Sequence, residues 1–322
     1  MPSFPKPKFE FEYEAGTEIK RLRKYRDTKP GRLIPPRDKS RLLVASWNVA
    51  NLGEQKRRDP DYKLIAEIIR WFDLVAVQEI KENLSGLDGI RAHLPKAYKA
   101  LYSDAAGNNE RMAFLYDSRK VGVLEEVGEI ALPVSEYPRI KLEGVDQEFK
   151  GFDRSPYFAA FQSGKFQFNL ASVHLYFGKF KNKQEAKRSM DRRALETYAV
   201  ATWAADRRRS KHTSIKDIIA LGDFNLPKME PDDPIYKALT RKGLLLPKHT
   251  SQVGSNLEGD MYYDQIGFFK EETVEFTGNI NVFDFDGAVF PALWELDPKK
   301  FRTFVKYYLS DHRPIWCEFK ID

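Results

Sequence analysis

Cysteine is almost absent from this chain, which has a single one, Cys317, among its 322 residues. One cysteine excludes an internal disulfide framework, and its place in the apolar run Pro-Ile-Trp-Cys-Glu-Phe predicts a buried packing residue rather than a nucleophile. Such a chain suits a reducing compartment, so a cytoplasmic location is expected. A mature secreted chain whose signal had been removed would look the same, and secretion therefore stays open.

Long apolar runs are also missing. No run approaches the roughly 18 residues that a membrane span needs, and the opening Met-Pro-Ser-Phe-Pro-Lys-Pro-Lys lacks the apolar region of a secretory signal. The expectation is a protein that does not associate with membranes. A composition of 42% hydrophobic and 31% charged residues allows one large core and excludes a disordered chain.

The positive charge is unevenly distributed. Residues 1–41 hold 12 Lys and Arg against 6 Asp and Glu, so this segment accounts for the whole net charge of +6. It also carries six of the 18 prolines. The pattern divides the chain into a basic, proline-containing extension over residues 1–40 and one folded domain over residues 41–322. The extension suits contact with a polyanion, and a surface brace lying along the domain is the alternative.

From residue 41 onward, apolar strands alternate with helices and polar loops. Strands are predicted at 42–49, 74–79, 111–116, 157–162, 166–175, 218–225, 262–269 and 314–319. Helices are predicted at 62–71, where apolar residues recur at helical spacing, and at 184–207. Many strands that are too apolar to be solvated on one face predict two sheets packed face to face with helices outside.

Five polar clusters end or follow these strands: Trp47-Asn48, Gln78-Glu79, Val173-His174, Gly222-Asp223-Phe224-Asn225 and Ser310-Asp311-His312. Carboxylates and amides at the ends of buried strands are costly to place unless they meet a cation or one another. Convergence on one metal site is the economical interpretation. Within the fourth cluster, strand alternation directs both polar side chains to one face and Phe224 to the other.

In this order, the five clusters resemble the endonuclease/exonuclease/phosphatase superfamily, and within it the deoxyribonuclease I-like nucleases. The resemblance runs from about Arg41 to Asp322. It implies a four-layer α/β sandwich of two mostly antiparallel sheets flanked by helices, with residues 41–322 as the catalytic domain. It also implies a hydrolytic enzyme that requires Mg²⁺, with Mn²⁺ as a substitute.

The resemblance assigns roles to individual residues. It implies that Glu79 is the principal metal ligand, with Asn48 beside it, Asp311 reaching the metal or its waters, and Asp223 serving a second metal or the attacking water. It implies that Asn48, Asn225 and Arg154 contact the phosphate of the substrate. His174 and His312 can divide the proton transfers between them, because imidazole titrates near neutrality. The family pairing gives Asp264 to His312 and Glu110 to His174.

Three departures limit the assignment within the superfamily. Ala50 stands where abasic-site endonucleases carry aspartate, Asn108 stands where deoxyribonuclease I has a minor-groove tyrosine, and Lys81 replaces an arginine after Gln-Glu. The predicted function is Mg-dependent hydrolysis of nucleic-acid phosphodiester bonds, with endonuclease action on DNA favoured over RNA. The alternatives are an RNA-specific nuclease, a phosphoesterase for a lipid or inositol head group, and a non-catalytic binding protein.

Overall fold

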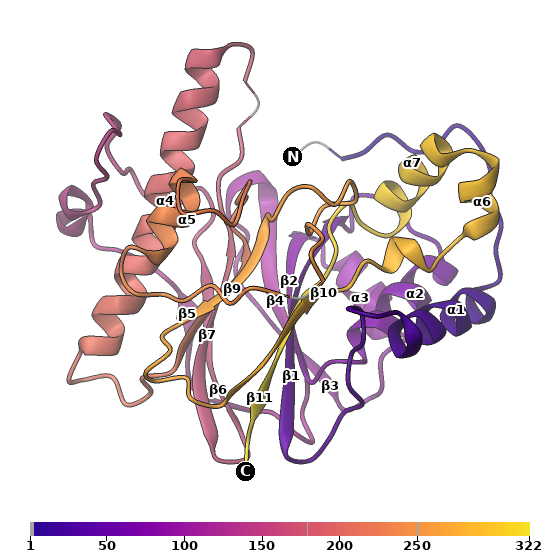
Figure 1. The fold of residues 1–322 in the computed structure, drawn as a ribbon, viewed down its shortest axis with the longest axis horizontal. Coiled ribbons are helices and arrows are strands. Elements are labelled where there is room, and N and C mark those ends of the chain that lie inside the picture. Colours follow the sequence, from indigo (N-terminus) through magenta and orange to yellow (C-terminus); the bar gives the residue numbers. More distant parts are fainter. Residues whose placement is uncertain (1–2, 179, 250) are drawn as a thin grey trace.

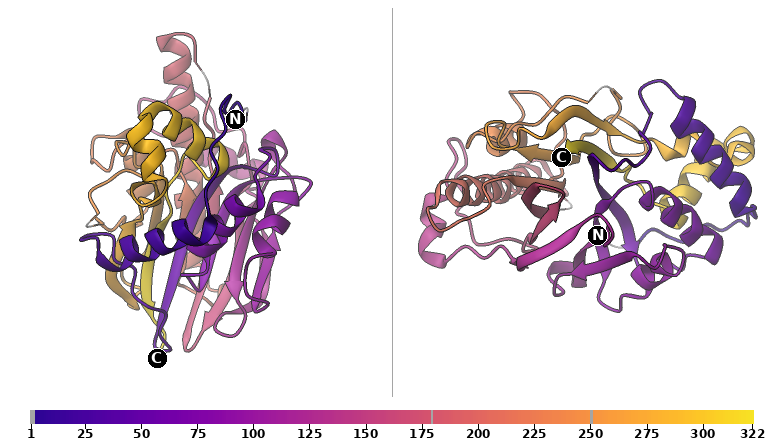
Figure 2. Two further views of the ribbon diagram at one scale, coloured as in Figure 1. Left: turned by 90° about the vertical axis from the view of Figure 1, so that its right-hand side faces the viewer. Right: turned by 90° about the horizontal axis from the view of Figure 1, so that it is seen from below.

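The computed structural model describes residues 3–178, 180–249 and 251–322. Two sheets pack face to face, and helices cover the outer side of each (Figures 1 and 2). The predicted four-layer α/β sandwich is therefore confirmed.

The first sheet has the strand order β10-β11-β1-β2-β4-β3. Its strands are β1 (Arg41–Leu52), β2 (Leu74–Lys81), β3 (Tyr98–Tyr102), β4 (Glu110–Asp117), β10 (Phe276–Val282) and β11 (Ile315–Lys320). The second sheet has the order β5-β6-β7-β8-β9. Its strands are β5 (Gly122–Glu129), β6 (Tyr157–Ser163), β7 (Phe166–His174), β8 (Ile218–Asp223) and β9 (Asp264–Phe268).

Strand direction decides where strand ends meet. Among the described residues, β1 runs parallel to β2, β7 runs parallel to β8, and the other paired strands are antiparallel. The expectation of mostly antiparallel sheets is thus confirmed. Because parallel neighbours end at the same edge, the two parallel pairs bring four carboxyl-terminal strand ends together at one edge of the sandwich.

Alternation along β1 separates two cores. Leu42 and Val44 face the second sheet, whereas Leu43, Ala45 and Trp47 pack against the helices outside the first sheet. Those helices are α1 (Ala15–Thr28), α2 (Asp59–Ile69), α3 (Ser85–Arg91), α6 (Pro291–Leu296) and α7 (Pro298–Tyr308). On the other side, α4 (Lys183–Arg209) and α5 (Pro234–Thr240) cover the second sheet. Three short 3₁₀ turns complete the elements, at Gly107–Asn109, Val134–Arg139 and Phe285–Gly287.

The basic N-terminal segment lies along the helices outside the first sheet (Figure 1). Leu22 of α1 is fully buried in that core. Arg23 forms an ion pair with Glu67 on α2 at 2.7 Å, and Arg37 forms one with the buried Asp73 at 2.5 Å. These contacts favour the brace over a free polyanion-binding arm. The division of the chain at residue 40 stays a prediction.

Arginines in the last turn of α4 are also paired. Arg207 contacts Glu126, and Arg208 contacts Glu272 at 2.7 Å. Cys317 is buried between the sheets, as its apolar surroundings predicted. Over the described ranges, the structure contains no helix with the length and apolar character that crossing a bilayer requires.

Candidate active site

All of the predicted polar clusters meet at the edge where the parallel strands end. Asn48 lies opposite Gln78, the neighbour of Glu79, across the β1 and β2 pair. In the second sheet His174 lies opposite Asp223, and Asp223 lies opposite Asp264 at the start of β9. His312 immediately precedes β11. The two sheets therefore each contribute about half of one site.

Backbone irregularities shape this edge. The pairing of β2 with β4 shifts register between Val77 and Ile80, and Glu79 within that bulge has a φ of 61°. Asn51 and Asn225 also adopt positive φ values, of 48° and 52°. The left-handed region is strained for residues other than glycine, and such strain is concentrated at functional sites.

The predicted strand over 218–225 ends early for a related reason. β8 stops at Asp223, because Gly222 has a φ of 130° and Asn225 is left-handed, so the chain leaves the sheet there. Phe224 still packs into the core beneath α4. The alternation expected of Asp223 and Asn225 is thus replaced by a turn in which Asn225 N donates to Asp223 Oδ1 at 2.9 Å.

Glu79 is the centre of the first half of the site. Its Oε1 accepts a hydrogen bond from Asn48 Nδ2 at 2.9 Å, and its Oε2 accepts one from the backbone N–H of Asn51 at 2.8 Å. Asn48 Nδ2 also donates to Asp223 Oδ2 at 3.1 Å. One amide group therefore joins two buried carboxylates, and it leaves Asn48 Oδ1 buried with no hydrogen-bond partner in the described part of the chain.

These residues fit a hard divalent cation. Glu79 and Asp311 form no ion pair with a lysine or arginine among the described residues, and burial together with the charge of Glu79 raises the pKa of Asp311 to about 6. A cation placed against Glu79 and Asp311 would offset that repulsion, and the unpartnered Asn48 Oδ1 is an oxygen of the kind that Mg²⁺ binds. The donor set thus supports the predicted metal ligands, whose roles stay predictions.

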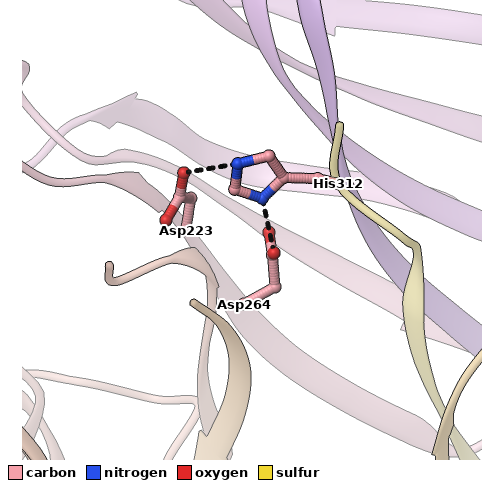
Figure 3. A group of neighbouring side chains, drawn as sticks. All are labelled: Asp223, Asp264 and His312. Carbon is pink, nitrogen blue, oxygen red and sulfur yellow. Dashed lines mark hydrogen bonds and ion pairs between the residues drawn. The ribbon is translucent and has the colours of Figure 1, made fainter. Parts of the chain in front are cut away.

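His312, Asp264 and Asp223 form a second cluster that has metal-ligand chemistry (Figure 3). His312 Nδ1 makes a 2.7 Å hydrogen bond with Asp264 Oδ2, and its Nε2 lies 3.7 Å from Asp223 Oδ2. Nδ1 is thus engaged by Asp264, so His312 and Asp264 bind each other through these two atoms, and only Nε2 of the ring stays open. The geometry therefore favours a histidine oriented by Asp264 for proton transfer over a three-ligand metal site.

Electrostatics supports that interpretation. Burial alone would lower the pKa of His312, but the carboxylates of Asp264 and Asp223 outweigh it and raise the pKa well above 6.5. Burial would likewise raise the pKa of Asp223, whereas the neighbouring His312 and His174 hold it below its usual value. Asp223 is therefore anionic near neutral pH.

The second histidine has its own carboxylate. His174 Nδ1 lies 3.2 Å from Glu110 Oε2, and its Nε2 lies 3.7 Å from both Glu79 Oε1 and Asp223 Oδ2. Although burial opposes ionisation, the contact with His174 lowers the pKa of Glu110 to about 2. The predicted pairing of each histidine with its carboxylate matches the distances. Both Nε2 atoms lie 3.7 Å from the same oxygen, Asp223 Oδ2.

Comparisons with known proteins show similarity in sequence and in fold. No family model matches the chain. A protein named deoxyribonuclease from Thioalkalivibrio sp. (strain K90mix) is 28% identical over 305 residues, which cover 89% of this chain and 73% of that protein. An endonuclease/exonuclease/phosphatase family protein from Bacteroides thetaiotaomicron superposes with a TM-score of 0.56 at 18% identity, covering 88% of this chain and 96% of that one.

The chain has the endonuclease/exonuclease/phosphatase fold. A mannosyl-6-phosphatase from Bacteroides thetaiotaomicron shares the fold, with a TM-score of 0.51 at 18% identity over 86% of this chain and 98% of that one. The predicted resemblance to the superfamily and the predicted hydrolytic enzyme class are confirmed at this level. The superfamily contains proteins named for different substrates, so the substrate is a separate question.

Two residues that the superfamily resemblance assigned to the substrate are tied to the chain itself. Arg154 is buried, and its Nε and Nη2 donate to the carbonyl oxygens of His174 and Leu175 at 2.8 and 3.0 Å. Asn225 Nδ2 also donates to Leu175 O, at 3.0 Å. Both side chains thus fix the segment that follows His174. Their contact with a phosphate stays a prediction.

Sequence reasoning missed three residues of the site. Asn51 donates its N–H to Glu79, and its buried Oδ1 has no partner within the described ranges. Ser310 Oγ donates to Asn48 O at 2.6 Å and accepts from His312 N at 3.0 Å, so it ties β1 to the loop before β11. The Tyr263 ring lies 5.7 Å from that of His312. Ser310 stands in one of the five polar clusters and Tyr263 in the predicted strand over 262–269, whereas nothing in the strand pattern marks Asn51.

Proposed function

We propose that this chain is a divalent-metal-dependent phosphodiesterase that hydrolyses the backbone of nucleic acid. DNA is the favoured substrate, cleavage is endonucleolytic, and Mg²⁺ is the metal, with Mn²⁺ as a substitute. The proposal is supported most strongly by one arrangement: two histidines, each with its own carboxylate, face Asp223 Oδ2 at 3.7 Å beside the carboxylate of Glu79. The sequence similarity to a deoxyribonuclease supports the choice of substrate.

The two histidines would divide the proton transfers. His312 is held by Asp264 through Nδ1, so its Nε2 is the atom that takes the proton of the attacking water. Asp223, next to that Nε2, would orient the water and stabilise the imidazolium that forms. His174 Nδ1 lies 3.2 Å from Glu110 Oε2, and its Nε2 would give a proton to the leaving oxygen.

The remaining residues would bind the phosphate. A cation held by Glu79, Asn48 Oδ1 and Asp311, with Asp223 as a further ligand, would neutralise the charge that develops on the phosphate oxygens. The amide of Asn225 and Nη1 of Arg154, which lies 3.2 Å from Asp153 Oδ2, would contact a phosphate oxygen. Arg154 Nη1 lies 3.7 Å from Glu110 Oε2, so it would also link substrate contact to the position of that carboxylate.

Metal dependence is the first test. Cleavage of supercoiled plasmid should require Mg²⁺ or Mn²⁺, and Glu79→Ala should lose nearly all turnover while its unfolding transition shows that it remains folded. Glu82→Gln is the control, because Glu82 is exposed three residues away. Full turnover in excess chelator would contradict the proposal.

Substrate choice is the second test, and the rival function is a phosphoesterase for a sugar, lipid or inositol head group. Supercoiled plasmid, linear duplex, single-stranded DNA, RNA and a head-group phosphodiester should be compared at equal phosphate concentration with Mg²⁺. Nicking of the closed circle would support an endonuclease. Turnover of the head-group substrate alone would favour the rival, and turnover of RNA alone would favour an RNA-specific nuclease.

A further inference from the structure

The segment between β7 and α4 begins beside the site. Residues 175–178 and 180–188, here called the rim, leave the strand that ends at His174 and continue into the first turns of α4. This part of the chain projects beyond the edge of the sheets at which the site residues gather (Figure 1). The composition of the rim is basic and aromatic, with Tyr176, Phe177, Phe180, Lys181, Lys183, Lys187 and Arg188.

The base of the rim is fixed directly to the candidate active site. Leu175 N donates to Asp223 O at 3.0 Å. The Phe177 ring lies 6.4 Å from the Tyr263 ring, which in turn lies 5.7 Å from the ring of His312. Phe180 follows Phe177 by three residues, a reach of at most about 11 Å of chain. The rim thus begins at the site and continues outward to Phe180.

The outer part of the rim presents one aromatic ring and two lysine side chains that have no ring contact or ion pair among the described residues. Phe180 has 52% of its surface exposed, so its ring is open to a ligand. Lys181 and Lys183 are exposed and form no ion pair within the described part of the chain. The arginines of the N-terminal segment differ in this respect, since Arg23 and Arg37 are paired with carboxylates of the domain.

We infer that the rim binds a single strand of the substrate, with Phe180 stacking on an unpaired base and Lys181 and Lys183 contacting its phosphates. The inference rests on the proposed function and narrows it to single-stranded or locally unpaired polynucleotide. Every base has a flat π face, so a lone aromatic ring with neighbouring cations recognises a strand without reading its sequence. A paired base offers no such face, because its neighbours in the duplex already stack on it.

The experiment compares three substrates and three variants. The substrates are a single-stranded oligonucleotide, the same strand with base-free residues flanking the scissile phosphate, and bis(4-nitrophenyl) phosphate. The variants are Phe180→Ala, Phe180→Trp and Leu33→Ala, where Leu33 is a control with the same 52% exposure on the N-terminal segment. Oligonucleotide binding is measured in parallel by fluorescence anisotropy in excess chelator, which prevents cleavage.

Phe180→Ala should lower kcat/KM on the normal strand by about 5- to 150-fold, the range that loss of one base–aromatic stack produces. The loss of kcat/KM in Phe180→Ala should be several-fold smaller on the base-free strand and on the small diester. Phe180→Trp should recover the kcat/KM of the wild type on the normal strand. Changing Lys181 and Lys183 to glutamine should reduce the slope of log K against log salt by about 0.7 for each lysine. Leu33→Ala should match the wild type throughout.

Two results would overturn the inference while leaving the proposed function intact. Equal losses on all three substrates would show that Phe180 only supports the fold of the site, and an unchanged kcat/KM on the normal strand would show that it makes no contact. If the wild-type protein neither binds nor cleaves any polynucleotide but turns over the small diester, the proposed function fails and the inference fails with it.

Discussion

The two histidine–carboxylate pairs differ in how much negative charge each histidine receives. His312 has a short 2.7 Å hydrogen bond to Asp264, whereas His174 has a 3.2 Å contact with Glu110. Asp264 has no second cationic partner among the described residues. Glu110 shares its charge with Lys81, at 3.2 Å, and with Arg154, at 3.7 Å.

This difference suggests why two similar pairs would take opposite roles. A histidine beside an unshared carboxylate is the stronger proton acceptor, and the pKa of His312 is raised accordingly. His174 faces a carboxylate that is divided between Lys81 and Arg154, which leaves His174 for the leaving oxygen. We therefore expect His312 to act on the attacking water and His174 on the leaving oxygen, and four experiments test that contrast.

The largest effect is expected from His312→Ala. Loss of the group that accepts the proton of water should reduce turnover by at least 10²- to 10⁴-fold, the usual worth of a general base. A substrate with a nitrophenyl leaving group should show the same loss, because an activated leaving group does not replace the base that deprotonates the attacking water. Rescue of His312→Ala by that substrate would mean that its role has been assigned wrongly.

His174→Ala should lose a comparable factor on a natural phosphodiester, about 10²- to 10⁴-fold. Nitrophenolate leaves without being protonated, so the nitrophenyl diester should recover most of that loss. In each histidine variant, the loss of kcat/KM on the natural phosphodiester is divided by the loss on the nitrophenyl diester, and the two ratios are compared. Equal ratios in the two variants would contradict the assignment of opposite roles to His174 and His312.

The carboxylate variants should have smaller effects than the histidine variants. Asp264→Asn should cost more than Glu110→Gln, because Asp264 makes the shorter bond and is the partner of the stronger base. Each double variant with its histidine should be no slower than the histidine variant alone, since a missing histidine leaves nothing to orient. Additive losses would show that Asp264 or Glu110 acts independently of its histidine.

The smallest effect is a shift in pH dependence. As a base, His312 works only when neutral, so the acidic limb of kcat/KM should rise with pH as it loses its proton. Asp264 raises the pKa of His312, and Asp264→Asn should therefore move that limb to lower pH. Glu110→Gln should leave the limb where it is. Profiles taken at one saturating Mg²⁺ concentration give the comparison, and a shift in the opposite direction would contradict it.

Much of the fold could be predicted because strand runs such as 74–79 and 218–223 are continuously apolar and buried on both faces. β5 could not, since it is an edge strand with Glu125 and Glu126 in its middle and shows no alternation. Helix α6 was missed because no pattern in the run Pro-Ala-Leu-Trp-Glu-Leu distinguishes a six-residue helix from a loop. Helix α7 was also missed, although its apolar residues recur at helical spacing.

The family resemblance indicated the residues of the site and its two histidine–carboxylate pairs, but not its other contacts. Ordered motifs identified Glu79, His174 and His312, whereas the bulge that directs Asn51 toward Glu79 depends on strand pairing that no local pattern records. Charge was misleading for the same reason. The excess in residues 1–41 is real, but a sequence does not say which carboxylate each cation meets, and Arg37 meets Asp73 inside the fold.

The position of β1 has a consequence for how the protein is made. β1, near the start of the chain, pairs with β11 near its end, and Trp47 Nε1 donates to His312 O across 265 residues of sequence. Contacts between residues so far apart in the sequence form late and slow folding. A ribosome therefore finishes most of the chain before Asn48 and His312 can meet, and any product cut short before Ile315 lacks the strand that holds them together. A growing or truncated chain should accordingly have no complete active site.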